Sequence, residues 1–373
     1  MNSKKLILII ALSLFAFALM LRAEDLQIDK SETYLIKKGD QFYFNVSSGD
    51  ILVKTWNKME VLVQISKFDK DEKTYEVVQR DNKLMINYNR NWDWASDNNL
   101  IITIPNQLLL DFRTGNGDII FENSYKGSIQ LKTNSGDISV SQVSGSVSIM
   151  SSGGDITCGD IDGNLAAETM GGDITVSNVT GNCSLDTKGG DIKSKNISGN
   201  MNAVTYGGDI EIGTVKRNLF VTTYGGDIEI QSSMENAKLI SYAGDIILNK
   251  SVGKVEIKAS AGDIRLNDCD GAVNLNSLSG DIYVSLNPKD RSIIKSNYGD
   301  IEVLIPSNSK VNIIASSKTA FDGEKLISSD FESFLTEEKI REGSSKKIYS
   351  INGGGNASID LKANNAKILI KKK

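Results

Sequence analysis

The sequence predicts an all-β protein, a two-sided parallel β-solenoid (β-helix-like) of 18-residue coils with an irregular N-terminal β cap and one short C-terminal helix. A Gly-Asp-Ile segment occurs eleven times between Gly117 and Gly299, and from Gly136 to Gly280 every step is 18 residues. Within each coil, apolar residues two positions apart fall into two halves of nine residues. Such alternation marks a strand with one buried face, and a fixed period marks a stack of equivalent coils.

The first element is a leader at residues 1–23. Lys4 and Lys5 precede an apolar run over 6–21, which ends at Arg22 and Ala23. This order is typical of a secretory signal peptide, with cleavage expected after Ala23. The alternative is an uncleaved anchor, but the run is shorter than the roughly 20 apolar residues that span a bilayer. We therefore expect export across the inner membrane to the periplasm, the outer surface or the medium, with no membrane span in the mature chain.

Composition excludes several function classes. The chain has 42 basic and 47 acidic residues, and removing Lys4, Lys5 and Arg22 with the leader changes the net charge from −5 to −8. An acidic surface repels phosphate backbones, so no nucleic-acid partner is expected. The sequence contains no histidine, which excludes Ser-His-Asp and Cys-His nucleophile systems and His-ligated zinc. We expect no catalytic residues, no cofactor and no metal.

Residues 24–113 form the second element, a β-rich but irregular region. Strands are expected at 42–46, 50–54, 60–66, 74–79, 83–88 and 100–104, as degenerate first coils and a cap over the edge of the stack. Trp92 and Trp94 lie two apart in a polar segment of this region. They are candidates for stacking on a sugar ring, and the alternative is apolar packing over the end of the solenoid.

The regular solenoid is expected at 114–305. Counting the motif glycine as zero, inward apolar residues favour positions +2, +4, +11 and +13, with a weaker site at +7, and glycines mark the corners. The three cysteines also fall at inward positions, so we expect them to be buried apolar side chains. Position +15 carries mostly hydroxyl residues, which predicts a hydroxyl ladder near the corner. Its members are Ser151, Thr169, Thr187, Thr205, Thr223, Ser241, Ala259 and Ser277.

An aspartate directly follows each motif glycine. Carboxylates one coil apart repel each other, so something must compensate. One interpretation is that each aspartate accepts N–H bonds within its own glycine turn; the other is a calcium ladder along this edge. The expected structural column is Asp155, Asp173, Asp191, Asp209, Asp227, Asp245, Asp263 and Asp281.

Three tyrosines share one column, two residues before the motif glycine. Alternation from the inward hydroxyl residues beside them predicts that Tyr206, Tyr224 and Tyr242 point outward. The column is a candidate ligand-contact strip, and the alternative is a stack that stiffens the sheet.

The repeated Gly-Gly-Asp-Ile segments, such as 153–156 and 207–210, resemble those of the bacterial putative-adhesin domain family of unknown function. They are also similar to the related head-domain putative auto-transporter adhesins. The resemblance covers residues from about 40 to the end. It implies a two-sheet superhelix, an envelope location and an adhesive role, and it brings no catalytic residues.

The last element is a C-terminal cap at 306–373. Ser329 and Glu332 have the spacing of a helix-capping box, and Gly343 suits a helix stop. Phe331, Phe334, Leu335 and Ile340 would form the apolar face of this helix. The stretch from Tyr349 to Ile370 is expected to be a last returning coil.

These features favour an exported, non-enzymatic envelope or surface protein, an adhesin or binding scaffold that presents a rigid solenoid face. Polysaccharide or an envelope or host surface protein is the expected partner, and the sequence leaves the oligomeric state open. The alternatives are a polysaccharide-active β-helix enzyme and an envelope sensor or regulatory partner protein. A polysaccharide-active site can use Asp, Lys and Arg without histidine, but it usually interrupts a repeat with charged loops, and the central coils carry no insertion.

Overall fold

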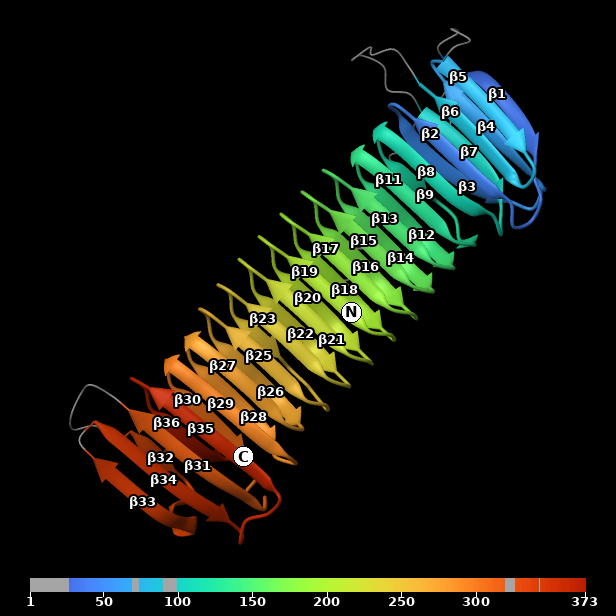
Figure 1. Cartoon of the computed structure of the whole chain (residues 1–373). Coiled ribbons are helices and arrows are strands. Elements are labelled where there is room, and N and C mark those ends of the chain that lie inside the picture. Colours follow the sequence, from blue (N-terminus) through green and yellow to red (C-terminus); the bar gives the residue numbers. More distant parts are fainter. Residues whose placement is uncertain (1–26, 69–73, 90–98, 319–325, 342) are drawn as a thin grey trace. The chain divides into compact units, whose positions relative to one another are not determined.

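The computed structural model describes residues 27–68, 74–89, 99–318, 326–341 and 343–373. The predicted signal peptide, Trp92 and Trp94 lie outside these residues. The chain divides into two compact units, one ending at Asp162 and the other running from Gly163 to Lys373. Each unit has two sheets of mostly parallel strands (Figure 1). Sheet A holds the strands that start at the Gly-Asp-Ile motif, and sheet B holds the strands that complete each coil.

Unit 1 begins with the irregular coils. Its sheet A contains β1 (Ile28–Leu35), β3 (Asp50–Trp56), β4 (Glu60–Ser66), β7 (Asn99–Pro105), β9 (Ile119–Phe121), β10 (Tyr125–Lys126), β12 (Ile138–Ser144) and β14 (Ile156–Asp162). Its sheet B contains β2 (Gln41–Val46), β5 (Tyr75–Arg80), β6 (Lys83–Tyr88), β8 (Leu109–Asn116), β11 (Ile129–Ser135) and β13 (Val147–Ser151). The six expected strands are confirmed within two residues as β2 to β7, whereas β1 and β8 were not predicted.

Unit 2 holds most of the regular coils. Its sheet A contains β16 (Ile174–Val179), β18 (Ile192–Ile197), β20 (Ile210–Val215), β22 (Ile228–Ser233), β24 (Ile246–Leu248), β26 (Ile264–Asp270), β28 (Ile282–Asn287), β30 (Ile301–Ile305), β32 (Ile327–Ser329) and β36 (Ile368–Lys372). Its sheet B contains β15 (Leu165–Thr169), β17 (Cys183–Thr187), β19 (Met201–Thr205), β21 (Leu219–Thr223), β23 (Ala237–Ser241), β25 (Val255–Ala259), β27 (Val273–Ser279), β29 (Arg291–Tyr298), β31 (Val311–Lys318), β33 (Leu335–Arg341), β34 (Ser344–Ile351) and β35 (Ala357–Asn364).

Within each unit the coils stack in register, as the repeat predicts. In unit 2, Ile192 pairs with Ile210, and Ile210 pairs with Ile228 in the next coil. These isoleucines are fully buried between the two sheets. Burying one such side chain contributes about 1.5–3 kcal/mol, which offsets the entropy lost by ordering a short coil.

The corner of each coil is tight because consecutive motif glycines touch. A Cβ on Gly208 would lie 2.2 Å from the carbonyl oxygen of Gly190, closer than any real side chain approaches. The hydroxyl ladder closes this corner. Thr205 donates to the Gly190 carbonyl at 2.8 Å, and its oxygen accepts the N–H of Gly208 at 3.2 Å. At Ser151, Thr187, Thr205 and Thr223 the glycine and hydroxyl columns are therefore two halves of one clamp between adjacent coils. The predicted ladder ends there, because Ser241 donates to the Gly244 carbonyl of its own turn and the buried Ser277 hydroxyl has no hydrogen-bond partner among the described residues.

The irregular coils at the ends depart from chain order. In unit 1, the β2–β3 coil lies between the β6–β7 coil and the β8–β9 coil. In unit 2, the last coil, β35–β36, lies between the β29–β30 coil and the β31–β32 coil. The last stretch is a coil as predicted, but it is inserted in the stack and paired on both sides.

The predicted C-terminal helix is wrong. Residues Glu332–Phe334 form one 3₁₀ turn, and β33 then pairs antiparallel with β34. The Ser329 hydroxyl accepts the Phe331 N–H at 3.0 Å, so the capping residue serves only this turn. Ile340, expected on a buried face, is 71% exposed. These residues form a strand in place of the predicted helix because one edge of β34 would otherwise have no hydrogen bonds.

Antiparallel strands cover the ends of the sheets. In unit 1, β4 pairs antiparallel with β1 and β7, and β5 pairs antiparallel with β6, which is the irregular β cap that the sequence predicts. Over the residues that the structure describes there is no α-helix, and accordingly no helix able to cross a bilayer.

The glycine contact can be tested with two adjacent residues of one turn. A Cβ on Gly154 would lie 2.0 Å from the Gly136 oxygen, whereas a Cβ on Gly153 meets no atom closer than 3.6 Å. We expect Gly154→Ala to lower the thermal unfolding midpoint by about 5–10 °C, since the coils must separate. Gly153→Ala should change it by less than about 2 °C. Equal midpoints for the two variants in a circular dichroism melt would contradict the clamp.

Candidate functional site

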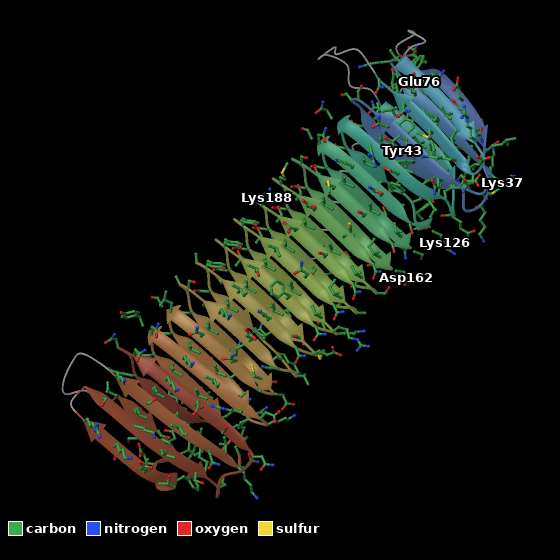
Figure 2. All side chains as sticks on the ribbon, in the orientation of Figure 1. Lys37, Tyr43, Glu76, Lys126, Asp162 and Lys188 are labelled. Carbon is green, nitrogen blue, oxygen red and sulfur yellow. The ribbon has the colours of Figure 1, made fainter. Side chains whose placement is uncertain are left out.

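Tyr206, Tyr224 and Tyr242 follow β19, β21 and β23 directly and point outward. Their exposed fractions are 50%, 42% and 48%. Neighbouring rings are parallel within 4°, with centroids 4.6 Å apart. Lys188 occupies the same column one coil earlier and also projects outward (Figure 2).

This stacking limits what the tyrosines offer to a ligand. Each ring covers the face of its neighbour, so the exposed parts are the ring edges and the hydroxyl groups. Only the outer faces of Tyr206 and Tyr242, at the two ends of the stack, remain uncovered. The column is therefore a row of phenol hydroxyls spaced by one coil, and it offers little flat aromatic surface.

The tyrosines belong to a larger apolar surface on sheet B. Alternation along β19, β21 and β23 places further side chains on the same side, because residues two apart share a face. We call this surface the aromatic face; it consists of Val204, Tyr206, Phe220, Tyr224, Ile240 and Tyr242, with Thr222 buried among them. Charged side chains flank it, with Asp186 paired beside Val204 and Lys258 paired beside Ile240.

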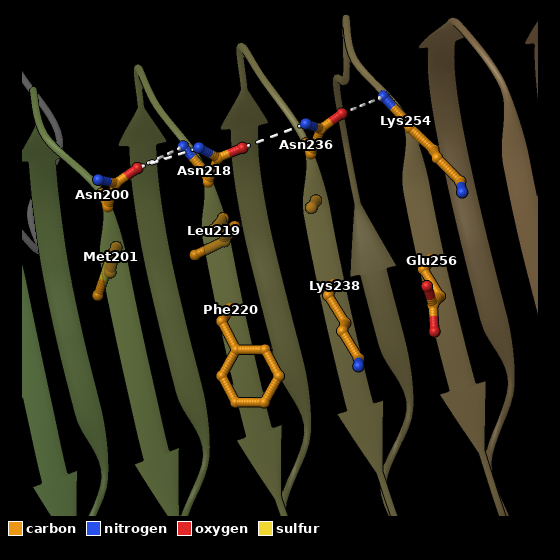
Figure 3. A pocket seen from close by; sticks show the side chains of 10 residues that line it. Asn200, Met201, Asn218, Leu219, Phe220, Asn236, Lys238, Lys254 and Glu256 are labelled. Atoms are coloured by element: carbon orange, nitrogen blue, oxygen red, sulfur yellow. Dashed lines mark hydrogen bonds between the residues drawn. The ribbon is translucent and has the colours of Figure 1, made fainter.

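Phe220 is the aromatic side chain of this face that presents its ring flat. It lies in the outward position of β21, 37% exposed, and Figure 3 shows the ring face-on at the centre of a shallow hollow. The hollow has a volume of about 350 Å³. Lys238 is the neighbour of Phe220 on β23, and its Nζ lies 5.8 Å from the ring centroid. Glu256 follows in the next coil.

An asparagine ladder forms one border of the hollow (Figure 3). The side-chain oxygen of Asn200 accepts the backbone N–H of Asn218 at 3.2 Å and its side-chain N–H at 3.1 Å. Asn236 repeats the side-chain bond to Asn218 at 3.2 Å, and Lys254 N–H donates to Asn236 at 3.2 Å. The sequence analysis missed this column and Phe220, although the 18-residue spacing of the asparagines would have revealed the ladder.

The outer face of sheet A differs in chemistry. In the same coils it carries Lys193, Lys195, Glu211 and Glu229, all exposed. These side chains form a solvated charged surface of the usual kind. Within these coils the apolar surface therefore belongs to sheet B.

The aspartate column binds backbone N–H groups, but not those of its own turn. Asp209 accepts the N–H of Asp227 at 2.8 Å, and Asp227 accepts that of Asp245 at 2.8 Å, so each carboxylate bonds to the next coil. The expectation of bonds within one turn is thus corrected: the carboxylate satisfies a donor that the neighbouring corner exposes. In the described parts of the chain, no cluster of three or more His, Cys, Asp or Glu side chains is placed to hold a metal ion.

The family follows from comparison with known proteins. The model of the family Toastrack DUF4097 matches residues 40–231 and 162–325, which together span most of the chain. The chain belongs to this family. The resemblance expected from the Gly-Gly-Asp-Ile segments is thereby confirmed. No curated protein matches the chain.

Solved structures similar to this toastrack chain include three from bacteria. A putative adhesin from Bacteroides fragilis is 15% identical, covers 93% of this chain and 97% of its own, and has a TM-score of 0.26. A putative adhesin from Parabacteroides merdae is 13% identical, with coverages of 65% and 94% and a TM-score of 0.32. A putative cell adhesion protein from Clostridium sporogenes is 10% identical, with coverages of 93% and 100% and a TM-score of 0.21.

The three cysteines of the toastrack chain are buried in its core, as predicted. Cys158, Cys183 and Cys269 are free thiols inside the coils. Burial raises the pKa of the Cys183 thiol to about 12 and that of Cys269 to about 11. The reactive thiolate is therefore disfavoured, and these side chains act as small apolar residues.

Asp118 gives a pH-dependent test of the carboxylate column. Burial, and then the neighbouring carboxylates of Asp50 and Asp137, raise its pKa, while the bond from the Asp137 N–H lowers it. Because the folded-state pKa is raised, folding disfavours the charged form, and stability falls as pH rises from the unfolded to the folded pKa. Asp118→Asn keeps the acceptor for the Asp137 N–H, which lies at 2.8 Å.

We expect Asp118→Asn to raise the thermal midpoint by about 1–3 °C at neutral pH. The gain should vanish near pH 3, below the unfolded-state pKa, where the native side chain is also neutral. Asp118→Ala, which lacks the acceptor, should lower the midpoint at both pH values. Melting curves at two pH values decide this, and an asparagine variant with no advantage at neutral pH would show that burial and the neighbouring carboxylates impose no net cost on charged Asp118.

Proposed function

We propose that this chain is an exported, non-enzymatic binding scaffold of the bacterial envelope or surface, which attaches to its ligand through the aromatic face. The observation that carries the proposal is the apolar outer surface of β19, β21 and β23. Contiguous exposed apolar side chains on a soluble protein mark interaction sites, particularly where charged residues surround them. Here Asp186 and Lys258 flank the surface in the adjacent coils, and the outer face of sheet A in the same coils carries charged side chains.

The stacked coils make this surface rigid. Each strand of the face pairs on both sides through parallel ladders, and the asparagine and tyrosine columns tie the two ends of the strands. A ligand therefore meets side chains that are already ordered, so little entropy is lost at the interface. This rigidity supports adhesion through a preformed, repetitive surface.

Binding is favoured over catalysis by the chemistry of the hollow. Hydrolysis of a glycosidic bond uses two carboxylates on either side of the bond. Among the described residues that line the hollow, Glu256 is the single carboxylate. The aspartates of the opposite corner each accept a backbone N–H, as in the Asp209–Asp227 contact.

The proposal is tested by removing the tyrosine column. The labelled chain would be measured for retention on isolated cell envelopes and on immobilised glycans. We expect the triple variant Tyr206→Ala, Tyr224→Ala, Tyr242→Ala to bind about tenfold more weakly, because it loses a contiguous part of the contact surface. The same samples, assayed for reducing sugar, should release none.

The matched control carries three exposed substitutions on sheet A of nearby coils, Lys193→Ala, Glu211→Ala and Glu229→Ala. It should bind like the native chain. Unchanged binding in the tyrosine variant would overturn the assignment of this face, and sugar release would overturn the non-enzymatic role. Retention by one membrane protein in place of glycan would indicate a sensor or regulatory partner.

A further inference from the structure

We infer that the ligand of the aromatic face is an acidic polysaccharide, which lies along the stacking direction of the coils with one sugar on Phe220 and its carboxylates near Lys238 and Lys254. This inference rests on the proposed function and names the ligand class for that face. Three features carry it: an exposed ring, two parallel rows of hydrogen-bonding groups, and a local excess of positive charge.

The ring of Phe220 is a platform for a sugar. Figure 3 shows the ring face-on among the lining side chains, and the residue is 37% exposed, with the Nζ of Lys238 over the ring at 5.8 Å from its centroid. A pyranose ring has an apolar C–H side, which packs on a flat aromatic face while its hydroxyl groups remain at the edges. The stacked tyrosines offer less of this surface, because neighbouring rings 4.6 Å apart cover each other and leave only the two outer ring faces of the stack.

Two rows of polar groups run beside this platform. Asn218 lies just before β21 and Tyr224 lies just after it, so the asparagine and tyrosine columns border the two ends of the same strands. An asparagine side-chain nitrogen carries two hydrogens, and the ladder bond to the preceding coil uses one of them. The second hydrogen and the tyrosine hydroxyls recur about every 4.8 Å along the stack.

The direction of the ligand follows from these rows. A chain lying along the stack meets the same donor in each successive coil, whereas a chain lying along a strand meets each row once. A polymer with repeating hydroxyl groups therefore makes the largest number of hydrogen bonds in the stacking direction. Its chemistry is that of a polysaccharide.

Charge selects an acidic member of this class. The protein as a whole is acidic, with a net charge of −5. The hollow nevertheless carries Lys238 and Lys254 against one carboxylate, Glu256, which has Lys258 at 4.0 Å as its partner. Within the described residues, neither Lys238 nor Lys254 forms an ion pair with a carboxylate. Two unpaired ammonium groups beside an aromatic platform complement sugar carboxylates spaced along a chain.

A nucleic acid fits this surface less well. Its backbone carries a charge at every nucleotide and requires a basic groove, whereas Asp186 and Glu256 lie on opposite sides of the face. A uronic-acid polymer offers one carboxylate per sugar to the two lysines and hydroxyl groups to the asparagine and tyrosine rows.

The experiment compares oligosaccharides of galacturonic acid with their methyl-esterified, neutral counterparts. Both would be titrated into the full chain by calorimetry, at low and at raised salt. We expect the acidic form to bind about tenfold or more tightly than the neutral form, with the difference shrinking as salt screens the lysines. Phe220→Ala should weaken binding of both forms by about tenfold, and Phe220→Tyr, which keeps the ring, should restore it.

The double variant Lys238→Ala, Lys254→Ala should remove the preference for the acidic form, because the hollow then offers neither form an ammonium group. Its matched control is Lys193→Ala, Lys195→Ala, two lysines exposed on sheet A, which should preserve the preference. Thermal midpoints of all variants should match the native chain, since the altered side chains lie at the surface.

The outcomes separate the ligand class from the proposed function. Equal binding of the two forms, or a preference that survives in the Lys238, Lys254 variant, overturns the acidic ligand and leaves the face in place. If neither form binds while the tyrosine variant still loses envelope binding, the inferred polysaccharide ligand is wrong and the aromatic face remains the binding surface. If neither form binds and the tyrosine variant keeps its envelope binding, both the inferred ligand and the proposed binding surface are wrong.

Discussion

The close contact between successive motif glycines is the constraint on which the regular coils depend. A glycine α-carbon lies so near the carbonyl of the preceding coil that no side chain fits, as at Gly208 and Gly190. This contact sets the corner, the corner sets the register of both sheets, and the register places each isoleucine above another isoleucine. The Thr205 hydroxyl and the Asp209 carboxylate then satisfy the donors and acceptors that such a corner exposes.

The same register determines how side chains are arranged on the outer faces of the sheets. Because every coil presents its side chains in the same directions, the outer faces are made of columns, and a column of one residue type becomes a continuous stripe. The tyrosine and asparagine columns are stripes of this kind, with no preference for one coil. We propose that specificity arises where a column changes identity, as it does along Asn202, Phe220, Lys238 and Glu256. The hollow around Phe220 lies at that change.

Much of the fold could be predicted from the sequence, because residues one repeat apart occupy equivalent positions in paired strands. Eighteen-residue spacing places Ile210 on Ile228, and alternation separates the inward Thr223 from the outward Tyr224. The arrangement of the irregular end coils could not be predicted from the sequence, because strands there pair between coils that are not consecutive in the chain. Nothing in the period indicates that β35 inserts between β29 and β31.

The capping residues 329–332 favour a helix locally, whereas the open edge of β34 favours a strand, and tertiary pairing overrides local propensity. Of the candidate site, the tyrosine column was visible as a repeat, and Phe220 was not, because it occurs once in its column.

The insertion of β35–β36 has a consequence for the evolution of the protein. The final coil is held inside the stack of unit 2 by pairing only with the coils immediately around it. Duplication or loss of one 18-residue segment among the regular coils would leave this insertion intact, since each coil contacts only its neighbours. Such an event changes the length of the unit by one layer, about 4.8 Å. Reach is therefore a trait that selection can adjust in uniform increments without redesigning either the interior or the terminus.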